Sequence, residues 1–244
     1  NIAAYFVMVL LNVLSNALPI NDQSMPEISA KYPSLFTPAG FTFSIWGVIY
    51  LALLVFLVWQ ALPAQRGNAK IAAISNWFKL NCMLNALWIV AWHYDLVIVS
   101  LLIMLAILVT LILIYRVLIA AIADAPWVEH LALYLPFSLY TGWITLATIA
   151  NASVVQTAYG LDDAVLGAVQ WTLLKLAAAG AIGATMILRF RDAPFALVIA
   201  WGAYGIAVKQ LSTPSVAGAA LTLSLLMLIL AGKDGLDRLL TNRS

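Results

Sequence analysis

This chain has very few charged residues. Twelve basic and ten acidic residues make up only 9% of its 244 residues, whereas 64% are hydrophobic. A soluble domain of this length carries far more charge and alternates apolar with polar positions. The sequence therefore predicts a membrane protein. Its formal net charge of +2 is too small, and its basic residues are too scattered, to indicate binding to nucleic acid.

Residues that build catalytic or metal sites are also scarce. Cys82 is the only cysteine, so it forms no disulfide within the chain, and His93 and His130 are the only histidines. No paired intramembrane carboxylate, phosphate-binding loop or Ser/His/Asp arrangement is present. We therefore expect no catalytic residues, no bound metal and no enzymatic activity.

Long apolar runs take up most of the chain. A helix needs about 20 apolar residues to cross the hydrocarbon, where its backbone must satisfy its own hydrogen bonds. We expect an all-α, polytopic membrane helix bundle with about eight spans, the third and seventh being short. The expected spans are Ile2–Leu18, Phe41–Leu62, Leu80–His93, Leu96–Ile119, Tyr134–Val155, Ala164–Leu188, Phe195–Leu211 and Val216–Ala231.

Prolines fall where several of these helices should begin or bend. Thr37-Pro38, Asp124 to Pro126 and Thr213-Pro214 are typical of helix starts, as is Pro194. Pro136 lies inside a helical pattern and predicts a kink.

Loop charge gives the expected orientation. With eight spans, nine Lys and Arg residues fall on one side and only Lys31 and Lys209 on the other. The nine are Arg66, Lys70, Lys79, Arg116, Arg189, Arg191, Lys233, Arg238 and Arg243. The positive-inside rule then places both termini in the cytoplasm. We expect an integral protein of a bacterial inner membrane.

Polar and aromatic residues within the spans share helix faces. Three- and four-residue spacings group Asn12, Ser15 and Asn16 in the first span, Asn81, Asn85, Trp88 and Trp92 in the third, and Trp143, Ala147 and Asn151 in the fifth, with Thr148 beside them. Trp46 and Tyr50 stand one turn apart in the second span. These four spans are expected to converge on a polar-aromatic cavity in the outer half of the membrane, suited to a flat hydrophobic ligand. The alternative is that the same residues only hold helices together.

Lys175 stands out as a charge near the middle of the sixth span. Such a residue indicates a functional site or a buried pair, although a lysine that extends its amine toward the membrane surface explains it equally well. Small residues, among them Gly180, Gly183 and Gly205, indicate close helix contacts in the last three spans.

Three motifs resemble those of the translocator-protein family, also called the tryptophan-rich sensory proteins (TspO/MBR). They are Pro38 with Trp46 and Tyr50; Leu84, Asn85 and Trp88; and Trp143, Ala147, Thr148 and Asn151. The resemblance covers about residues 1–155 and implies a five-helix unit there, with residues 156–244 forming three additional helices and a short cytoplasmic tail. The sequence departs from the family pattern at Ala39, which replaces the second proline of a pair, and by lacking a proline pair in the third span.

The family resemblance implies a ligand site. It suggests that Trp46, Tyr50, Asn85, Trp88, Trp143, Ala147, Thr148 and Asn151 line or brace a pocket for a tetrapyrrole such as a porphyrin, or for a sterol- or carotenoid-like molecule. No cofactor is certain. The expected partners are membrane lipid, such a hydrophobic small molecule, and a second copy of the chain or other membrane subunits.

Three functions remain open from the sequence. The first is a receptor or carrier for a flat hydrophobic ligand, which the resemblance favours. The others are a secondary transporter and a structural or accessory subunit of a larger membrane complex, for example a pigment–protein assembly.

Overall fold

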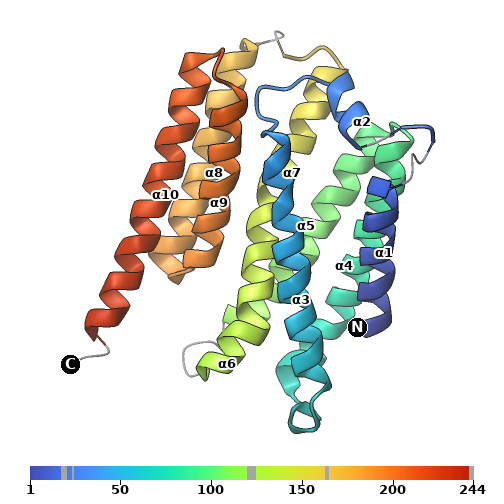
Figure 1. Ribbon diagram of the computed structural model, residues 1–244, viewed down its shortest axis with the longest axis vertical. Helices are drawn as coiled ribbons and strands as arrows, with labels where there is room; N and C mark the ends of the chain where they lie inside the picture. The colour runs from blue at the N-terminus through green and yellow to red at the C-terminus, as the bar shows by residue number, and fades with distance from the viewer. Residues whose placement is uncertain (18–20, 24, 120–124, 163–164, 242–244) are drawn as a thin grey trace. The chain divides into compact units, whose positions relative to one another are not determined.

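The computed structural model describes residues 1–17, 21–23, 25–119, 125–162 and 165–241. They form an all-α protein (Figure 1). Its long helices are α1 (Ile2–Ala17), α3 (Ile45–Ala61), α4 (Ala69–His93), α5 (Val97–Ile119), α7 (Leu135–Ala158), α8 (Ala168–Phe190), α9 (Ala193–Lys209) and α10 (Pro214–Thr241). Short elements are α2 (Met25–Lys31), α6 (Trp127–Glu129), the 3-10 turns η1 (Gly40–Ser44) and η2 (Pro63–Gln65), and the π-helical turn η3 (His130–Tyr134).

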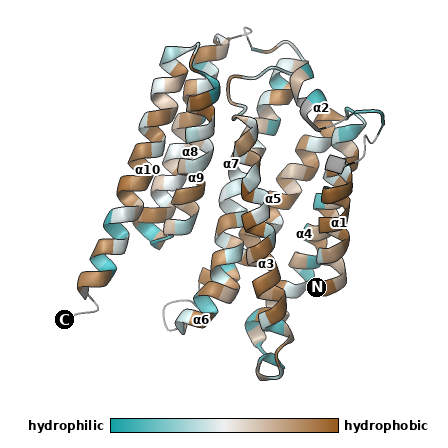
Figure 2. Cartoon of the chain, in the orientation of Figure 1, coloured by the Kyte–Doolittle hydropathy of each residue, from teal (hydrophilic) through white to brown (hydrophobic). Residues whose placement is uncertain are grey.

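Five helical segments of the described chain are long and apolar enough to cross a membrane: Gly40–Ala61, Val97–Ile119, Trp127–Ala158, Ala168–Phe190 and Pro214–Leu240. Figure 2 shows the apolar residues running along helices such as α3 and α5. The chain is an integral membrane protein built as a helix bundle. The remaining helices of the predicted eight are shorter, as α1 and α9 are, or more polar, as α4 is, so the total of eight spans stays a prediction.

The chain divides into two compact units. Unit 1 contains residues 1–33 and 46–159, and unit 2 contains residues 34–45 and 160–244. The segment Ser34–Ile45, which leads into α3, therefore belongs with the C-terminal helices. The predicted division into residues 1–155 and 156–244 did not assign residues 34–45 to the C-terminal part. The two domains stay a prediction.

The helices of unit 1 pack against one another in pairs. The helix α4 packs against α1 and α5, and α5 packs in turn against α7. A triad of edge-to-face rings joins α3, α4 and α7: the ring centroids of Phe56, Phe78 and Phe137 lie 5.2–5.8 Å apart, and all three side chains are fully buried. The triad forms part of the apolar core of the unit.

The short helix α2 is tied to the loop between α4 and α5. Lys31 Nζ lies 2.7 Å from the carboxylate of Asp95, and the Tyr32 hydroxyl donates to the same carboxylate at 2.9 Å. Asn21 donates to the backbone oxygen of His93 at 3.1 Å. Burial acts to raise the pKa of Asp95, but the bonds from Lys31 and Tyr32 outweigh it and hold that pKa below its usual range.

Unit 2 packs three helices closely. An added Cβ at Gly180 would lie 2.9 Å from Leu223, and one at Gly183 would lie 2.8 Å from Met227, so the predicted small-residue contacts are confirmed at these two positions. At the other end of α8, Asp234 accepts from Arg191 at 2.6 Å and from Arg238 at 2.8 Å. These bonds join the end of α8 to the last turns of α10.

Several predicted helix starts need correction. The helix that contains the predicted third span, α4, begins at Ala69 rather than Leu80, because Asn68 caps it by accepting from the backbone N–H groups of Lys70 and Ile71. The helix is therefore longer than the predicted span. Thr37 and Pro38 do not begin the second span: the first helical turn, η1, starts at Gly40, and no side chain caps it.

The other boundaries lie nearer the expectation. Pro214 begins α10, and Pro194 lies in the first turn of α9 as predicted. The helix α10 continues past Ala231 to Thr241, where Arg238 pairs with Asp234 one turn earlier. A π-helical turn, His130–Tyr134, stands just before Pro136 where the kink was expected. The sixth helix begins at Ala168, not Ala164; Ala164 and the predicted start at Asp124 fall outside the described residues.

The Asp95 contacts should contribute a pH-dependent part of the stability. Because the pKa of Asp95 is lower in the folded state, its contribution is complete above about pH 4, the unfolded value, and is lost as the pH falls through the folded value. Asp95→Asn should lower the free energy of unfolding at pH 7 by about 0.2–1 kcal/mol, the range for partly exposed ion pairs.

Asn is the informative replacement because Asp95 has a φ of 59°, a conformation that Asn tolerates. Asp95→Ala should cost more, since it adds backbone strain. Thermal unfolding in detergent from pH 7 to pH 3 measures both. A difference between the parent and Asp95→Asn that persists undiminished at pH 3 would contradict the ionic role of Asp95.

Candidate functional site

Four aromatic rings from two helices of unit 1 form one cluster. The Trp46 ring stacks on Tyr50 at 5.3 Å between centroids and meets Tyr140 and Trp143 edge to face at 5.8 and 6.4 Å. Trp46 and Tyr50 lie on α3, whereas Tyr140 and Trp143 lie on α7. We call these four residues the aromatic cluster.

Hydrogen bonds from α1 and α4 hold two residues of the aromatic cluster in place. Asn12 of α1 donates to the side-chain oxygen of Asn85 on α4 at 2.8 Å, and Asn85 donates to the Tyr140 hydroxyl at 2.9 Å. Tyr5 of α1 donates to the backbone oxygen of Tyr50 at 2.8 Å. The four helices expected to converge therefore do meet, and polar groups join them.

The members of the cluster differ in burial. Tyr140 is 1% exposed, Trp143 is 3% exposed and Asn85 is 2% exposed, whereas Trp46 and Tyr50 are only partly buried. The buried base of the site thus consists of Tyr140, Trp143 and Asn85. The Trp46 ring packs against this base, and part of the surface of Trp46 and Tyr50 stays accessible.

Trp88 lies in a second cluster. Its ring stacks on Trp92 at 5.4 Å, and the pair packs with Ile28 of α2, with Val97 of α5 and with Val154 of α7. The indole nitrogen of Trp88 is buried and has no acceptor within the described part of the chain. The predicted polar-aromatic face of α4 is therefore divided. Asn85 contacts the aromatic cluster, whereas Trp88 packs in the second cluster with Ile28 of α2.

The remaining predicted residues of α7 make local or structural contacts. Thr148 donates to the backbone oxygen of Ile144 at 2.7 Å, and Asn151 accepts from Ser100 of α5 at 3.3 Å. Ala147 is partly buried. Whether these three residues touch a ligand stays a prediction. The side chain of Asn16 falls outside the described residues.

Lys175 is nearer a helix end than the sequence suggested. Because α8 begins at Ala168, Lys175 comes seven positions after its first residue, about 10 Å at 1.5 Å per residue. The Lys175 side chain is partly buried, and the acid Asp162 in the preceding turn interacts with it electrostatically. The Cα–Cβ bonds of a helix tilt toward its N-terminus, so the shorter path from the amine to a membrane surface runs toward that end of α8.

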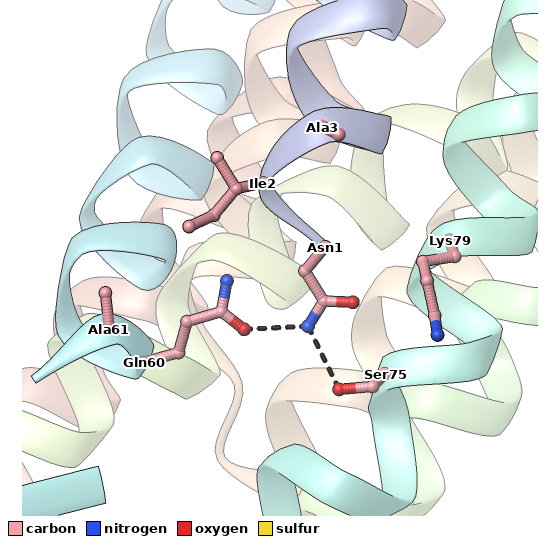
Figure 3. Close-up of a pocket in the computed structure, with 7 residues that line it drawn as sticks. All are labelled: Asn1, Ile2, Ala3, Gln60, Ala61, Ser75 and Lys79. Carbon is pink, nitrogen blue, oxygen red and sulfur yellow. Dashed lines mark hydrogen bonds between the residues drawn. The ribbon is translucent and has the colours of Figure 1, made fainter. Parts of the chain in front are cut away.

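Unit 1 also has an open polar hollow of about 480 Å³ at the other end of α3 (Figure 3). Asn1 is one of the residues that line it and donates to Gln60 at 2.7 Å and to Ser75 at 3.0 Å. Gln60 comes 14 residues after Trp46, about 21 Å along the helix. The hollow is therefore separate from the aromatic cluster.

Tyr140 and Tyr5 were not among the residues predicted from the sequence. Tyr140 precedes Trp143 by three residues and so shares its helix face, a spacing that could have indicated it. Tyr5 carries no comparable signal, because its hydroxyl bonds to a backbone atom 45 residues away.

Comparison with protein families finds that residues 1–232 match the family described as TSPO-like protein. The match covers almost the whole chain, so the chain belongs to this family. It continues through α8, α9 and most of α10, which corrects the expectation that the resemblance ends near residue 155. Neither a curated protein nor a solved structure matched the chain.

Proposed function

We propose that this TSPO-like membrane protein is a receptor or carrier for a flat hydrophobic ligand, and that the aromatic cluster of unit 1 holds it. A tetrapyrrole suits the site, as does a sterol- or carotenoid-like molecule. The observation that carries the proposal is the Trp46–Tyr50 stack, which is partly accessible and rests on the buried rings of Tyr140 and Trp143.

The chemistry of these residues supports a ligand that is mostly apolar. Aromatic faces offer a large contact area to a planar ring system, and few groups nearby can form hydrogen bonds. Asn85 already uses its oxygen for Asn12 and one of its N–H groups for Tyr140, which keeps the base of the site rigid. The unpaired indole N–H of Trp88 is available to an acceptor on a ligand that reaches the second cluster.

Membership of the family agrees with this proposal, since TSPO-like proteins are in general receptors or carriers rather than enzymes. We further propose that both termini face the cytoplasm of a bacterial cell, from the distribution of Lys and Arg in the loops. The aromatic cluster then lies in the outer half of the membrane.

Ligand binding can be read from tryptophan emission. A porphyrin bound at the cluster should quench that emission, and Trp46→Leu should weaken binding by about 1–3 kcal/mol, the scale of a lost aromatic contact. Trp143→Leu should weaken it too, because it removes part of the base. Trp77→Leu is the control, since Trp77 is 38% exposed on α4 and lies outside both clusters.

Equal porphyrin affinity in the parent, Trp46→Leu and Trp143→Leu would place the ligand elsewhere. An absorption spectrum of the purified protein adds an independent test, because a retained pigment gives a visible band. Stable copurification of other subunits, with no ligand bound, would instead favour the accessory-subunit function.

Lys175→Met separates a structural role of Lys175 from a role in anion binding. The replacement keeps the length of the side chain and removes its charge. If the amine only extends toward the membrane surface, the variant should be as stable as the parent and bind porphyrin equally well. This is the expected result, because Lys175 lies only about 10 Å inside α8.

A role of Lys175 in anion binding would give a different result. If Lys175 contacts a ligand carboxylate, the folded variant should lose affinity for a porphyrin dicarboxylate but keep its affinity for the dimethyl ester. A titration with both compounds measures the difference, which is expected to be absent.

A further inference from the structure

The segment before α3 is held by a helix far away in the sequence. Ala39 donates its backbone N–H to the backbone oxygen of Gly205 on α9 at 3.0 Å. Trp201 of α9 donates its indole N–H to the backbone oxygen of Thr42 at 2.9 Å. The two bonds run in opposite directions between the same two segments, so they fix the position of the backbone at residues 39–42.

Ring packing adds to these bonds. Phe41 meets Trp201 edge to face at 5.4 Å between centroids, and it meets Tyr204 at 6.0 Å. Thr42 is fully buried beside it. We call this set of contacts, made by Ala39, Phe41 and Thr42 with α9, the α9 anchor.

Gly205 is required for so close an approach. A Cβ at this position would overlap the side chain of Thr42, whose Cβ and Cγ2 would also lie only 3.0 Å away. The clash involves a buried residue whose backbone oxygen is bonded to Trp201, so Thr42 has little freedom to move. Small residues allow such backbone contacts between membrane helices.

The bond from Ala39 also satisfies a backbone group at the start of this helical segment. The first N–H groups of a helix lack partners within that helix, and no side chain caps η1. In hydrocarbon an unsatisfied N–H is costly. Gly205 supplies the acceptor, so the start of this membrane-spanning segment depends on α9.

The segment leads directly into the aromatic cluster. Residues Gly40–Ala61 form one continuous apolar helical segment, and Trp46 comes one turn after Thr42. We propose that α9, through Gly205 and Trp201, fixes the start of this helical segment and thereby the conformation of the turn that leads along the chain into Trp46. Gly205 and Trp201 are positioning residues in this account, which rests on the proposed function only for its effect on ligand affinity.

Two variants remove different parts of the anchor. Gly205→Ala introduces the clash with Thr42, and Trp201→Phe removes the N–H while keeping a ring against Phe41. Gly218→Ala is the matched control, because an added Cβ there has no atom within 4 Å although Gly218 lies on α10 of the same unit. If Gly205→Ala does not yield folded protein, Trp201→Phe decides the matter.

The first readouts need no ligand. Amide hydrogen exchange at residues 39–50 should become roughly tenfold faster in both anchor variants and stay unchanged in Gly218→Ala. The near-ultraviolet circular dichroism of Trp46, obtained by subtracting the spectrum of Trp46→Phe in each background, should change in the anchor variants only. Unchanged exchange, or faster exchange with an unaltered Trp46 signal, would overturn the proposal.

Porphyrin affinity is the third readout. It should fall by roughly 2- to 30-fold in Gly205→Ala and Trp201→Phe, the range for a coupled position that does not touch the ligand. Full affinity in both variants would contradict the positioning role. A parent protein that binds no porphyrin contradicts the proposed function alone, because exchange and dichroism still decide whether the anchor positions Trp46.

Discussion

A buried amide in an apolar bundle must satisfy its hydrogen bonds, and Asn85 does so by joining three helices. It accepts from Asn12 of α1 and donates to Tyr140 of α7. An unsatisfied amide in hydrocarbon is costly, so this arrangement selects one register of α1, α4 and α7. The position of the Tyr140 ring follows from it, and Trp46 packs against that ring.

The rest of the site follows from this base. With Tyr140 and Trp143 fixed and buried, the Trp46–Tyr50 stack is supported on one side and accessible on the other. The accessible faces of these two rings are the surface on which the proposed planar apolar ligand would pack. The contacts of Ala39 and Thr42 with α9 hold the backbone of the segment from which Trp46 follows along the chain. The family match across residues 1–232 agrees with a single function for the whole chain.

The all-α membrane fold could be predicted because composition and apolar run length determine it directly. Trp46 and Tyr50 could be placed together, since a four-residue spacing fixes two side chains on one helix face. Helix starts were less predictable where charged or polar residues continue a helix beyond the apolar run, as at Asn68 and Lys70.

Contacts between distant segments account for most of what sequence reasoning missed. Tyr140 shares a helix face with Trp143, but its bond to Asn85 joins residues 55 positions apart, and no local pattern indicates that bond. Trp88 shares a face with Asn85 by spacing, yet it packs with Trp92 and Ile28 rather than with the aromatic cluster. The bond between Trp201 and Thr42 spans 159 residues, and no local pattern indicates it.

The central claim is that the Asn85–Tyr140 bond holds the aromatic cluster in the form that binds ligand. A double-mutant cycle of Asn85→Ala and Tyr140→Phe, with the free energy of porphyrin binding as the readout, tests it most directly. Since each replacement breaks the same bond, the account predicts that each single variant weakens binding and that the double variant is little worse than either. Unchanged affinity in both single variants, or losses that simply add, would contradict it.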